Sequence, residues 1–215
     1  MIRAKAIFCG NRESLSKLAG VQISEPFLSL NSLVASRGLS SLNNPISLKI
    51  LPKKIYRVMG KNGAGKTTLL RIVAGLKSPL KGTVQGEGHF CFIGHQDCQN
   101  FDLTVIETLD IWSQFYGGGS QTAIDVFALE SLLNHPIYQL SQGQKQRLAL
   151  ARLFCGAFNF WILDEPFSNL DGVWIEKIEQ LFLDYTRKGG SIIFSEHEQT
   201  ARLFDPESIV LENPS

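Results

Sequence analysis

The 215-residue sequence predicts an α/β domain with a mainly parallel sheet, and two patterns support this prediction. From Phe27 onward, short apolar runs typical of strands alternate with longer amphipathic runs, the order expected when helices connect parallel strands. Two of the apolar runs also end in polar segments, one rich in glycine and one acidic. With 44% hydrophobic residues, the chain is long enough to bury one good core, so we expect one compact domain.

The first elements of the domain are expected to be strands of antiparallel type. They cover residues 27–34 and 46–50, and a third short apolar strand covers residues 55–59. A helix follows over residues 67–74 and should end at Gly75, because glycine readily takes the left-handed conformation that closes a helix.

Composition and charge argue against several classes of protein. The 21 basic and 20 acidic residues leave a net charge of +1, so no nucleic-acid partner is expected. The four cysteines lack paired spacing, which indicates reduced thiols and no disulfide framework. No run approaches the roughly 18 to 20 apolar residues that a membrane-spanning helix needs, and residues 1–26 lack the apolar stretch of a secretory signal. We expect no membrane span and assign no role to this N-terminal extension.

A complete phosphate-binding loop follows the strand at residues 55–59. Its sequence, GKNGAGKT, has a glycine, four further residues and then Gly-Lys-Thr, which is the spacing of a P-loop. Glycines let backbone N–H groups close around a phosphate, the following helix adds its dipole, and the lysine supplies a positive charge. The expected nucleotide-binding residues are Gly60, Lys61, Asn62, Gly63, Ala64, Gly65, Lys66, Thr67 and Thr68.

An acidic pair stands at the end of a second apolar strand, in the stretch FWILDEPFSNLD at residues 160–171. Asp164 lies where the strand leaves the core, and a carboxylate at that point could hold Mg²⁺ directly or through water. Glu165 follows and could orient and deprotonate the water that attacks a phosphate. The alternative is an acidic pair that merely caps a turn, and the P-loop about 100 residues upstream argues against it.

A second candidate anion site begins the stretch LSQGQKQRLALARL at residues 140–153, which is expected to be helical. Ser141, Gly143 and the unpaired N–H groups of a helix N-terminus could bind a phosphate. The segment offers no base and no metal ligand, so it could complete a site but not form one alone. Without the P-loop, an ordinary capped helix would explain it equally well.

These segments, in this order, resemble the ATP-binding subunits of ABC transporters from residue 27 to residue 211. The resemblance implies a P-loop NTPase fold of the ABC ATPase type, ATP hydrolysis, and a single domain over residues 27–211. Residues 97–140 would form its small helical subdomain. There, Thr104 to Glu107 matches a capping box, so a helix from about Val105 should run to the glycines that follow residue 116.

The resemblance also implies roles that spacing alone does not assign. Gln96, in FIGHQ, would sense the γ-phosphate and share Mg²⁺ with Thr67 and Asp164. His197, in IIFSEH, would be the switch histidine that acts with Glu165 in catalysis. ATP and Mg²⁺ are therefore the expected ligands.

The same resemblance implies the partners. ABC ATPases form head-to-tail homodimers, in which the segment containing Ser141, Gly143 and Gln144 caps the γ-phosphate lying on the P-loop of the other subunit. The dimer powers an integral membrane permease and would lie peripherally on the cytoplasmic side of the inner membrane.

Two positions depart from the family pattern. Gln142 stands where many members have glycine, which leaves Ser141 and Gly143 in place. The position that usually stacks an aromatic ring on adenine falls within residues 35–39, which contain no aromatic residue, and Arg37 could stack there instead.

Within the family, the segments IGHQ, LSQGQKQRLALARL and WILDEPF are most similar to the ATPase subunits of cytochrome c maturation, or haem export, transporters. Two alternatives stay open. One is the ATPase subunit of another small ABC transporter, and the other is a soluble ABC ATPase that assists iron–sulfur cluster assembly.

Overall fold

The structure is a computed structural model that describes residues 26–37, 40–41, 44–86, 88–94, 102–196 and 203–211. The strands are β1 (Leu28–Val34), β2 (Ser36–Arg37), β3 (Ser40–Ser41), β4 (Ile46–Ile50), β5 (Ile55–Met59), β6 (Lys81–Gly86), β7 (Phe90–Ile93), β8 (Phe160–Asp164), β9 (Ser191–Ser195) and β10 (Glu207–Val210). The α-helices are α1 (Lys66–Val73), α2 (Val105–Tyr116), α3 (Gln121–Phe127), α4 (Gln142–Ala151) and α5 (Gly172–Arg187). Three short 3-10 helices are η1 (Glu130–Leu132), η2 (Ile137–Gln139) and η3 (Arg152–Phe154).

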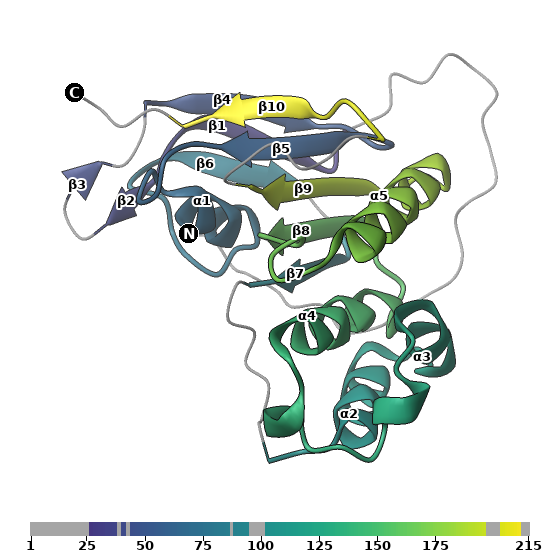
Figure 1. Ribbon diagram of the computed structural model, residues 1–215. Helices are drawn as coiled ribbons and strands as arrows, with labels where there is room; N and C mark the ends of the chain where they lie inside the picture. Colours follow the sequence, from purple (N-terminus) through teal and green to yellow (C-terminus); the bar gives the residue numbers. More distant parts are fainter. Residues whose placement is uncertain are drawn as a thin grey trace, which may run out of the picture.

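Two sheets form the framework of the domain (Figure 1). One is antiparallel, with strand order β4-β1-β6, and the other is a five-stranded parallel sheet, with order β10-β5-β9-β8-β7. The predicted α/β class, with its mainly parallel sheet and antiparallel N-terminal strands, is therefore confirmed.

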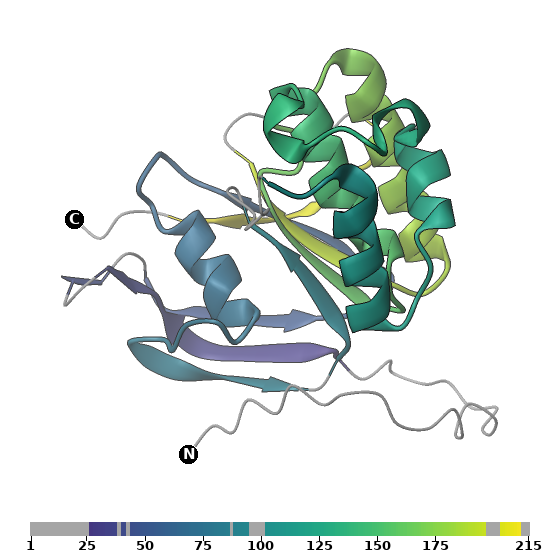
Figure 2. The same cartoon turned by 90° about the horizontal axis from the view of Figure 1, so that it is seen from below.

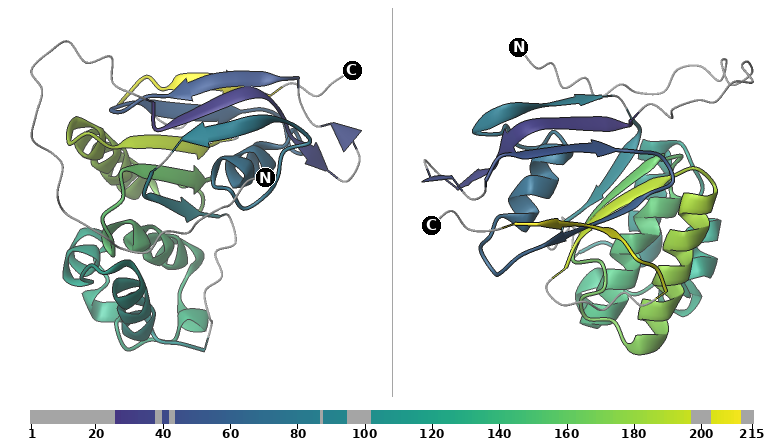
Figure 3. Two further views of the ribbon diagram at one scale, coloured as in Figure 1. Left: turned by 180° about the vertical axis from the view of Figure 1, so that it is seen from behind. Right: turned by 90° about the horizontal axis from the view of Figure 1, so that it is seen from above.

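The parallel sheet separates two hydrophobic cores, because successive residues of a strand point to opposite faces. On β8, Phe160 and Ile162 face the core formed with α1 and the antiparallel sheet. Trp161 and Leu163 face a second core, which includes residues of α2, α3, α4 and α5. Figure 2 shows α1 lying between the two sheets, and Figure 3 shows the other helices gathered on the opposite side.

The local signals in the sequence place several elements correctly. β4 and β5 have the predicted bounds, and α1 begins at Lys66, one residue earlier than predicted. Thr104 and Glu107 form the predicted reciprocal capping box at the start of α2, and left-handed Gly117 ends that helix. No helix in the described part of the chain is long and apolar enough to cross a membrane.

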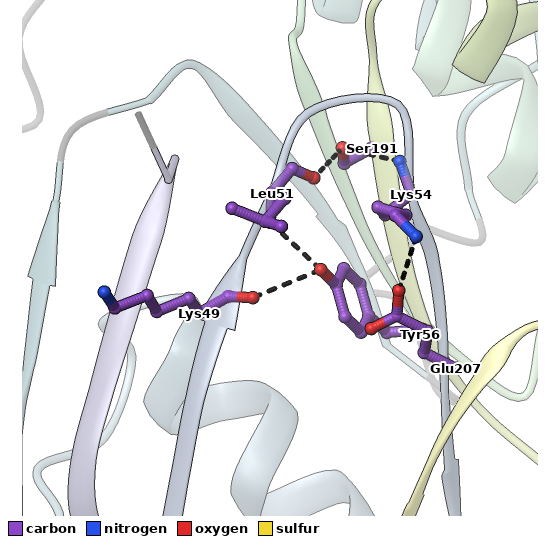
Figure 4. Close-up of polar contacts among 6 residues, drawn as sticks. All are labelled: Lys49, Leu51, Lys54, Tyr56, Ser191 and Glu207. Carbon is purple, nitrogen blue, oxygen red and sulfur yellow. Dashed lines mark hydrogen bonds and ion pairs between the residues drawn. The ribbon is translucent and has the colours of Figure 1, made fainter. Parts of the chain in front are cut away.

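A polar network at the amino-terminal ends of β5 and β9 joins the two sheets (Figure 4). The Tyr56 hydroxyl donates to the carbonyl of Lys49 at 3.1 Å and accepts the N–H of Leu51 at 3.0 Å. The Ser191 hydroxyl donates to the carbonyl of Leu51 at 2.7 Å and accepts the N–H of Lys54 at 3.3 Å. The turn between β4 and β5 is thus fastened to the parallel sheet at the end opposite the glycine loop.

Candidate functional site

The glycine loop connects the end of β5 to the start of α1. Gly60 has a φ of 154°, and a Cβ there would lie 2.8 Å from the carbonyl oxygen of Leu211, so a side chain would force the backbone to move. Gly63 and Gly65 have φ values of 82° and 98°, in the left-handed region that glycine enters without strain. Gly65 is also the N-cap of α1. The sequence folds here into the strand, loop and helix that a P-loop requires.

The Lys66 side chain is 6% exposed and points back into this loop. Its ammonium donates hydrogen bonds to the carbonyls of Gly60 at 2.8 Å and of Lys61 at 3.4 Å. Burial lowers the pKa of Lys66, because a desolvated ammonium is less stable, and the negative charges of Glu165 and Asp164 partly oppose this shift. The charge of the Lys66 ammonium therefore interacts with the charges of the Asp164 and Glu165 carboxylates.

Asp164 is the last residue of β8 and is 2% exposed. Its Oδ1 accepts a hydrogen bond of 2.5 Å from the Ser195 hydroxyl at the end of β9. Its Oδ2 is buried without a hydrogen-bond partner among the residues that the structure describes. A buried carboxylate oxygen normally has a partner, and Mg²⁺ prefers such oxygen ligands. With Thr67 in the first turn of α1, the donor atoms present fit a magnesium ion.

Glu165 lies directly after the strand, with a left-handed φ of 55° that turns the chain out of the sheet. Its N–H donates to the Ser195 hydroxyl at 3.0 Å. From α4, the Gln146 amide donates to the carbonyls of Pro166 at 3.0 Å and of Glu165 at 3.4 Å. The backbone that carries Glu165 is therefore held from both β9 and α4.

The second predicted anion site is the N-terminus of α4. Ser141 and Gln144 form a capping box, in which the Ser141 hydroxyl accepts the N–H of Gln144 at 3.2 Å and the Gln144 side chain accepts the N–H of Ser141 at 2.8 Å. A Cβ on Gly143 would lie 2.8 Å from the carbonyl oxygen of Asn169, so glycine permits the close approach of α4 to the loop after β8. The helix N-terminus is thereby fixed against residues that follow Glu165 in the chain.

A shallow pocket of about 210 Å³ opens beside this helix N-terminus. It is lined by Ser141, Gly143, Gln144, Arg147, Asn169, Leu170, Asp171 and Trp174. The Arg147 guanidinium and the Lys177 ammonium each lie 4.5 Å from the centre of the Trp174 ring. Residue spacing does not reveal the contact between Arg147 and Trp174, because the two residues lie on different helices.

One chain does not bring its two candidate phosphate sites together. The residues of α1 pack in the core on one face of the parallel sheet, and those of α4 pack in the core on the other. No residue of the glycine loop lines the pocket at Ser141. Gln96 and His197 lie outside the described residues, as does the side chain of Arg37.

A glycine loop with a buried lysine, together with a buried aspartate and a glutamate at the end of a second strand of the same parallel sheet, defines a P-loop nucleotide-binding protein. The ABC transporter family profile matches residues 43–168. The chain therefore belongs to the ABC transporter family, as an ATP-binding subunit and an ATPase.

Individual relatives agree with this assignment. The chain is 37% identical over 172 residues to the cytochrome c biogenesis ATP-binding export protein CcmA of Ruegeria pomeroyi, covering 79% of this chain and 84% of the relative. It is 35% identical over 187 residues to the protein of the same name from Nitrosococcus oceani, covering 80% and 87%. For the fold alone, a solved structure of the ATP-binding subunit of an ABC transporter superposes with a TM-score of 0.79 at 23% identity, covering 87% of this chain and 86% of that one.

Proposed function

We propose that this chain binds and hydrolyses ATP to power a separate membrane permease in cytochrome c maturation, with haem export as the transport step. The observation that carries the proposal is the identity of 35 to 37% to CcmA proteins over about four fifths of the chain. Those relatives are named as ATP-binding export proteins of cytochrome c biogenesis.

Residues 60–68 are proposed to hold the phosphates of ATP. The backbone N–H groups of the glycine loop and of the first turn of α1 would surround the β-phosphate, in the field of the helix dipole. Lys66 already lies inside this loop, so exchanging its bonds to loop carbonyls for bonds to phosphate oxygens needs no rearrangement of the main chain. Contacts with the phosphates are therefore proposed to contribute most of the binding of the nucleotide.

Thr67, Asp164 and Gln96 are proposed to hold Mg²⁺, directly or through water. The support for this proposal is the unpaired, buried Oδ2 of Asp164 in the described part of the chain. When bound, the ion would supply positive charge to the β- and γ-phosphate oxygens.

Glu165 is proposed as the general base. Its left-handed backbone turns the chain away from the strand, and the support from electrostatics is that the negative charge of Glu165 opposes the lowering of the Lys66 pKa. It would accept a proton from the water that attacks the γ-phosphate. Gln96 and His197 are proposed to orient this water and the γ-phosphate from the segments that follow β7 and β9.

Assembly is proposed to be a head-to-tail homodimer. Because α1 and α4 pack on opposite faces of the sheet, Ser141, Gly143 and Gln144 are available to cap a nucleotide bound to a second chain. The dimer would dock on the permease from the cytoplasmic side of the inner membrane. Residues 97–140 would provide the helical subdomain of a domain spanning residues 27–211.

A chromosomal replacement tests the transport assignment. A strain that carries Glu165→Gln in place of the wild-type gene should lose covalently bound haem from its c-type cytochromes and keep its b-type cytochromes, as measured by haem staining and difference spectra. A tagged Glu165→Gln protein purified from membranes should carry the permease with it. Normal c-type cytochromes, with a different transporter copurified, would reject the cytochrome c assignment and leave the ATPase assignment intact.

A further inference from the structure

Strand β9 carries a buried serine at each end, within an otherwise apolar sequence. Ser191 and Ser195 flank Ile192, Ile193 and Phe194, and all five residues are completely buried. A buried hydroxyl costs free energy unless it makes hydrogen bonds, so each serine is expected to have hydrogen-bond partners close by.

Ser191 has a purely structural set of partners. Its hydroxyl donates to the carbonyl of Leu51 and accepts the N–H of Lys54, both in the turn that leads into β5 (Figure 4). These partners are backbone atoms at the amino-terminal end of the sheet.

Ser195 makes the same kind of double contact at the carboxyl-terminal end, but one of its partners is a side chain. Its hydroxyl has a single proton, and it donates this proton to Oδ1 of Asp164 at 2.5 Å. It accepts the N–H of Glu165 at 3.0 Å. One hydroxyl thus contacts both residues of the acidic pair, from 31 and 30 positions away in the sequence.

The contact with Asp164 makes the two oxygens of its carboxylate unequal. Oδ1 is held by Ser195, which fixes the rotation of the carboxylate about its bond to Cβ. Oδ2 is left without a hydrogen-bond partner among the described residues. Fixing one oxygen while leaving the other available is how an outer hydrogen bond orients a metal-binding carboxylate.

The contact with Glu165 fixes the start of the turn after β8. Because Glu165 adopts a φ of 55°, the direction of its side chain depends on where this turn begins. The end of β9 is itself held in place, since the N–H of Glu196 donates to the carbonyl of Val58 at 3.2 Å.

We propose that Ser195 is a positioning residue for the ATPase reaction: its hydroxyl orients the Asp164 carboxylate toward the metal and sets the backbone of Glu165. This inference rests on the proposed role of Asp164 as a magnesium ligand. In this role Ser195 would act through Asp164 and Glu165, the two residues that its hydroxyl contacts.

The test compares serine variants of the full chain by their affinity for ATP, measured by equilibrium dialysis with saturating Mg²⁺ and again with EDTA. The ratio of the two affinities is the magnesium effect. Ser195→Ala should reduce this effect by about 10- to 100-fold, the usual cost of removing an outer-shell partner, and leave the affinity in EDTA unchanged. Ser195→Thr, which keeps the hydroxyl, should retain most of the effect.

Ser191→Ala is the matched control, because it also removes one donated and one accepted hydrogen bond from the same buried strand. Urea unfolding should show a similar loss of stability for both alanine variants, but Ser191→Ala should keep the full magnesium effect. A full magnesium effect in Ser195→Ala, or an equal loss in Ser191→Ala, would overturn the inference.

Asp164→Asn separates this inference from the function on which it rests. If Asp164→Asn loses the magnesium effect and Ser195→Ala keeps it, only the role of Ser195 is wrong. If Asp164→Asn keeps the full effect, the role proposed for Asp164 fails, and the inference about Ser195 fails with it.

Discussion

The ammonium of Lys66 donates a 2.8 Å hydrogen bond to the carbonyl of Gly60, so the lysine side chain folds back onto the first residue of the P-loop. The lysine is buried, and its pKa is lowered by desolvation. A bound phosphate would replace a neutral carbonyl by an anionic acceptor, and the hydrogen bond would become stronger.

Lys66→Ala is expected to weaken ATP binding on the order of 10- to 100-fold, because hydrogen bonds to charged groups are worth more than neutral ones. Equilibrium dialysis with radiolabelled ATP measures the change. Lys188→Ala, which removes an exposed lysine at the end of α5, is the control and should bind ATP normally. Equal affinities in the two variants would contradict the P-loop assignment.

Glu165→Gln should bind ATP, fail to hydrolyse it and accumulate as an ATP-bound dimer. The substitution removes the proposed base but leaves the phosphate-binding groups in place. Light scattering with saturating ATP measures the mass, and phosphate release measures hydrolysis. A protein that stays monomeric, both alone and with its permease, would show that the N-terminus of α4 is only a helix cap.

Adding Ser141→Arg to Glu165→Gln should return the ATP-bound protein to the monomer. A bulky cation at the start of α4 would meet the lysine of the second P-loop, and like charges at an interface oppose association. Lys145→Arg, on the same helix, keeps the charge already present there and should leave the dimer intact. A persistent dimer in the Ser141→Arg protein would place the dimer interface elsewhere.

Arg57 on β5 and Glu196 after β9 form a buried ion pair, and losing both partners should destabilise the protein less than simple addition of the two single losses would suggest. The charged atoms are 3.9 Å apart, and both side chains are 7% exposed. Arg57→Met or Glu196→Leu alone should cost about 3 to 5 kcal/mol, because each leaves a buried charge without its partner, and the double variant should cost much less than the sum. A double-mutant cycle in urea tests this, and additive losses would contradict it.

The capping box at α2 should make stability depend on acid pH. Hydrogen bonds from the Thr104 N–H and hydroxyl lower the pKa of Glu107 below its ordinary value. This contribution is therefore fully present above the unfolded-state pKa and is lost as the pH falls through the folded-state pKa. The unfolding free energy should fall between about pH 5 and pH 3 less steeply in Glu107→Gln than in the wild type, as measured by urea titrations across that range. Parallel slopes would contradict the prediction.

Much of the fold could be predicted because its signals are local. β4 alternates apolar and polar residues, and β5 is apolar except for Arg57. The capping box at Thr104 lies within four residues. The site was predictable only in part, since spacing indicates Lys66, Asp164 and Glu165 but says nothing about what holds them. Ser195 ends an apolar strand two residues before His197, and nothing in that pattern distinguishes it from Ser191 at the other end.

By itself, the sequence determined the elements, the chemistry of the glycine loop and the acidic pair, because the conformation of a turn or a cap depends on neighbouring residues. The tertiary structure alone decided which of these elements meet. Packing the strands in parallel order brings Ser195 onto Asp164 across 31 positions, and glycine at position 143 lets α4 approach Asn169. The same packing places α1 and α4 on opposite faces of the sheet, because alternate residues of β8 supply two separate cores. Such pairings arise from the burial of whole surfaces, and no local pattern encodes them.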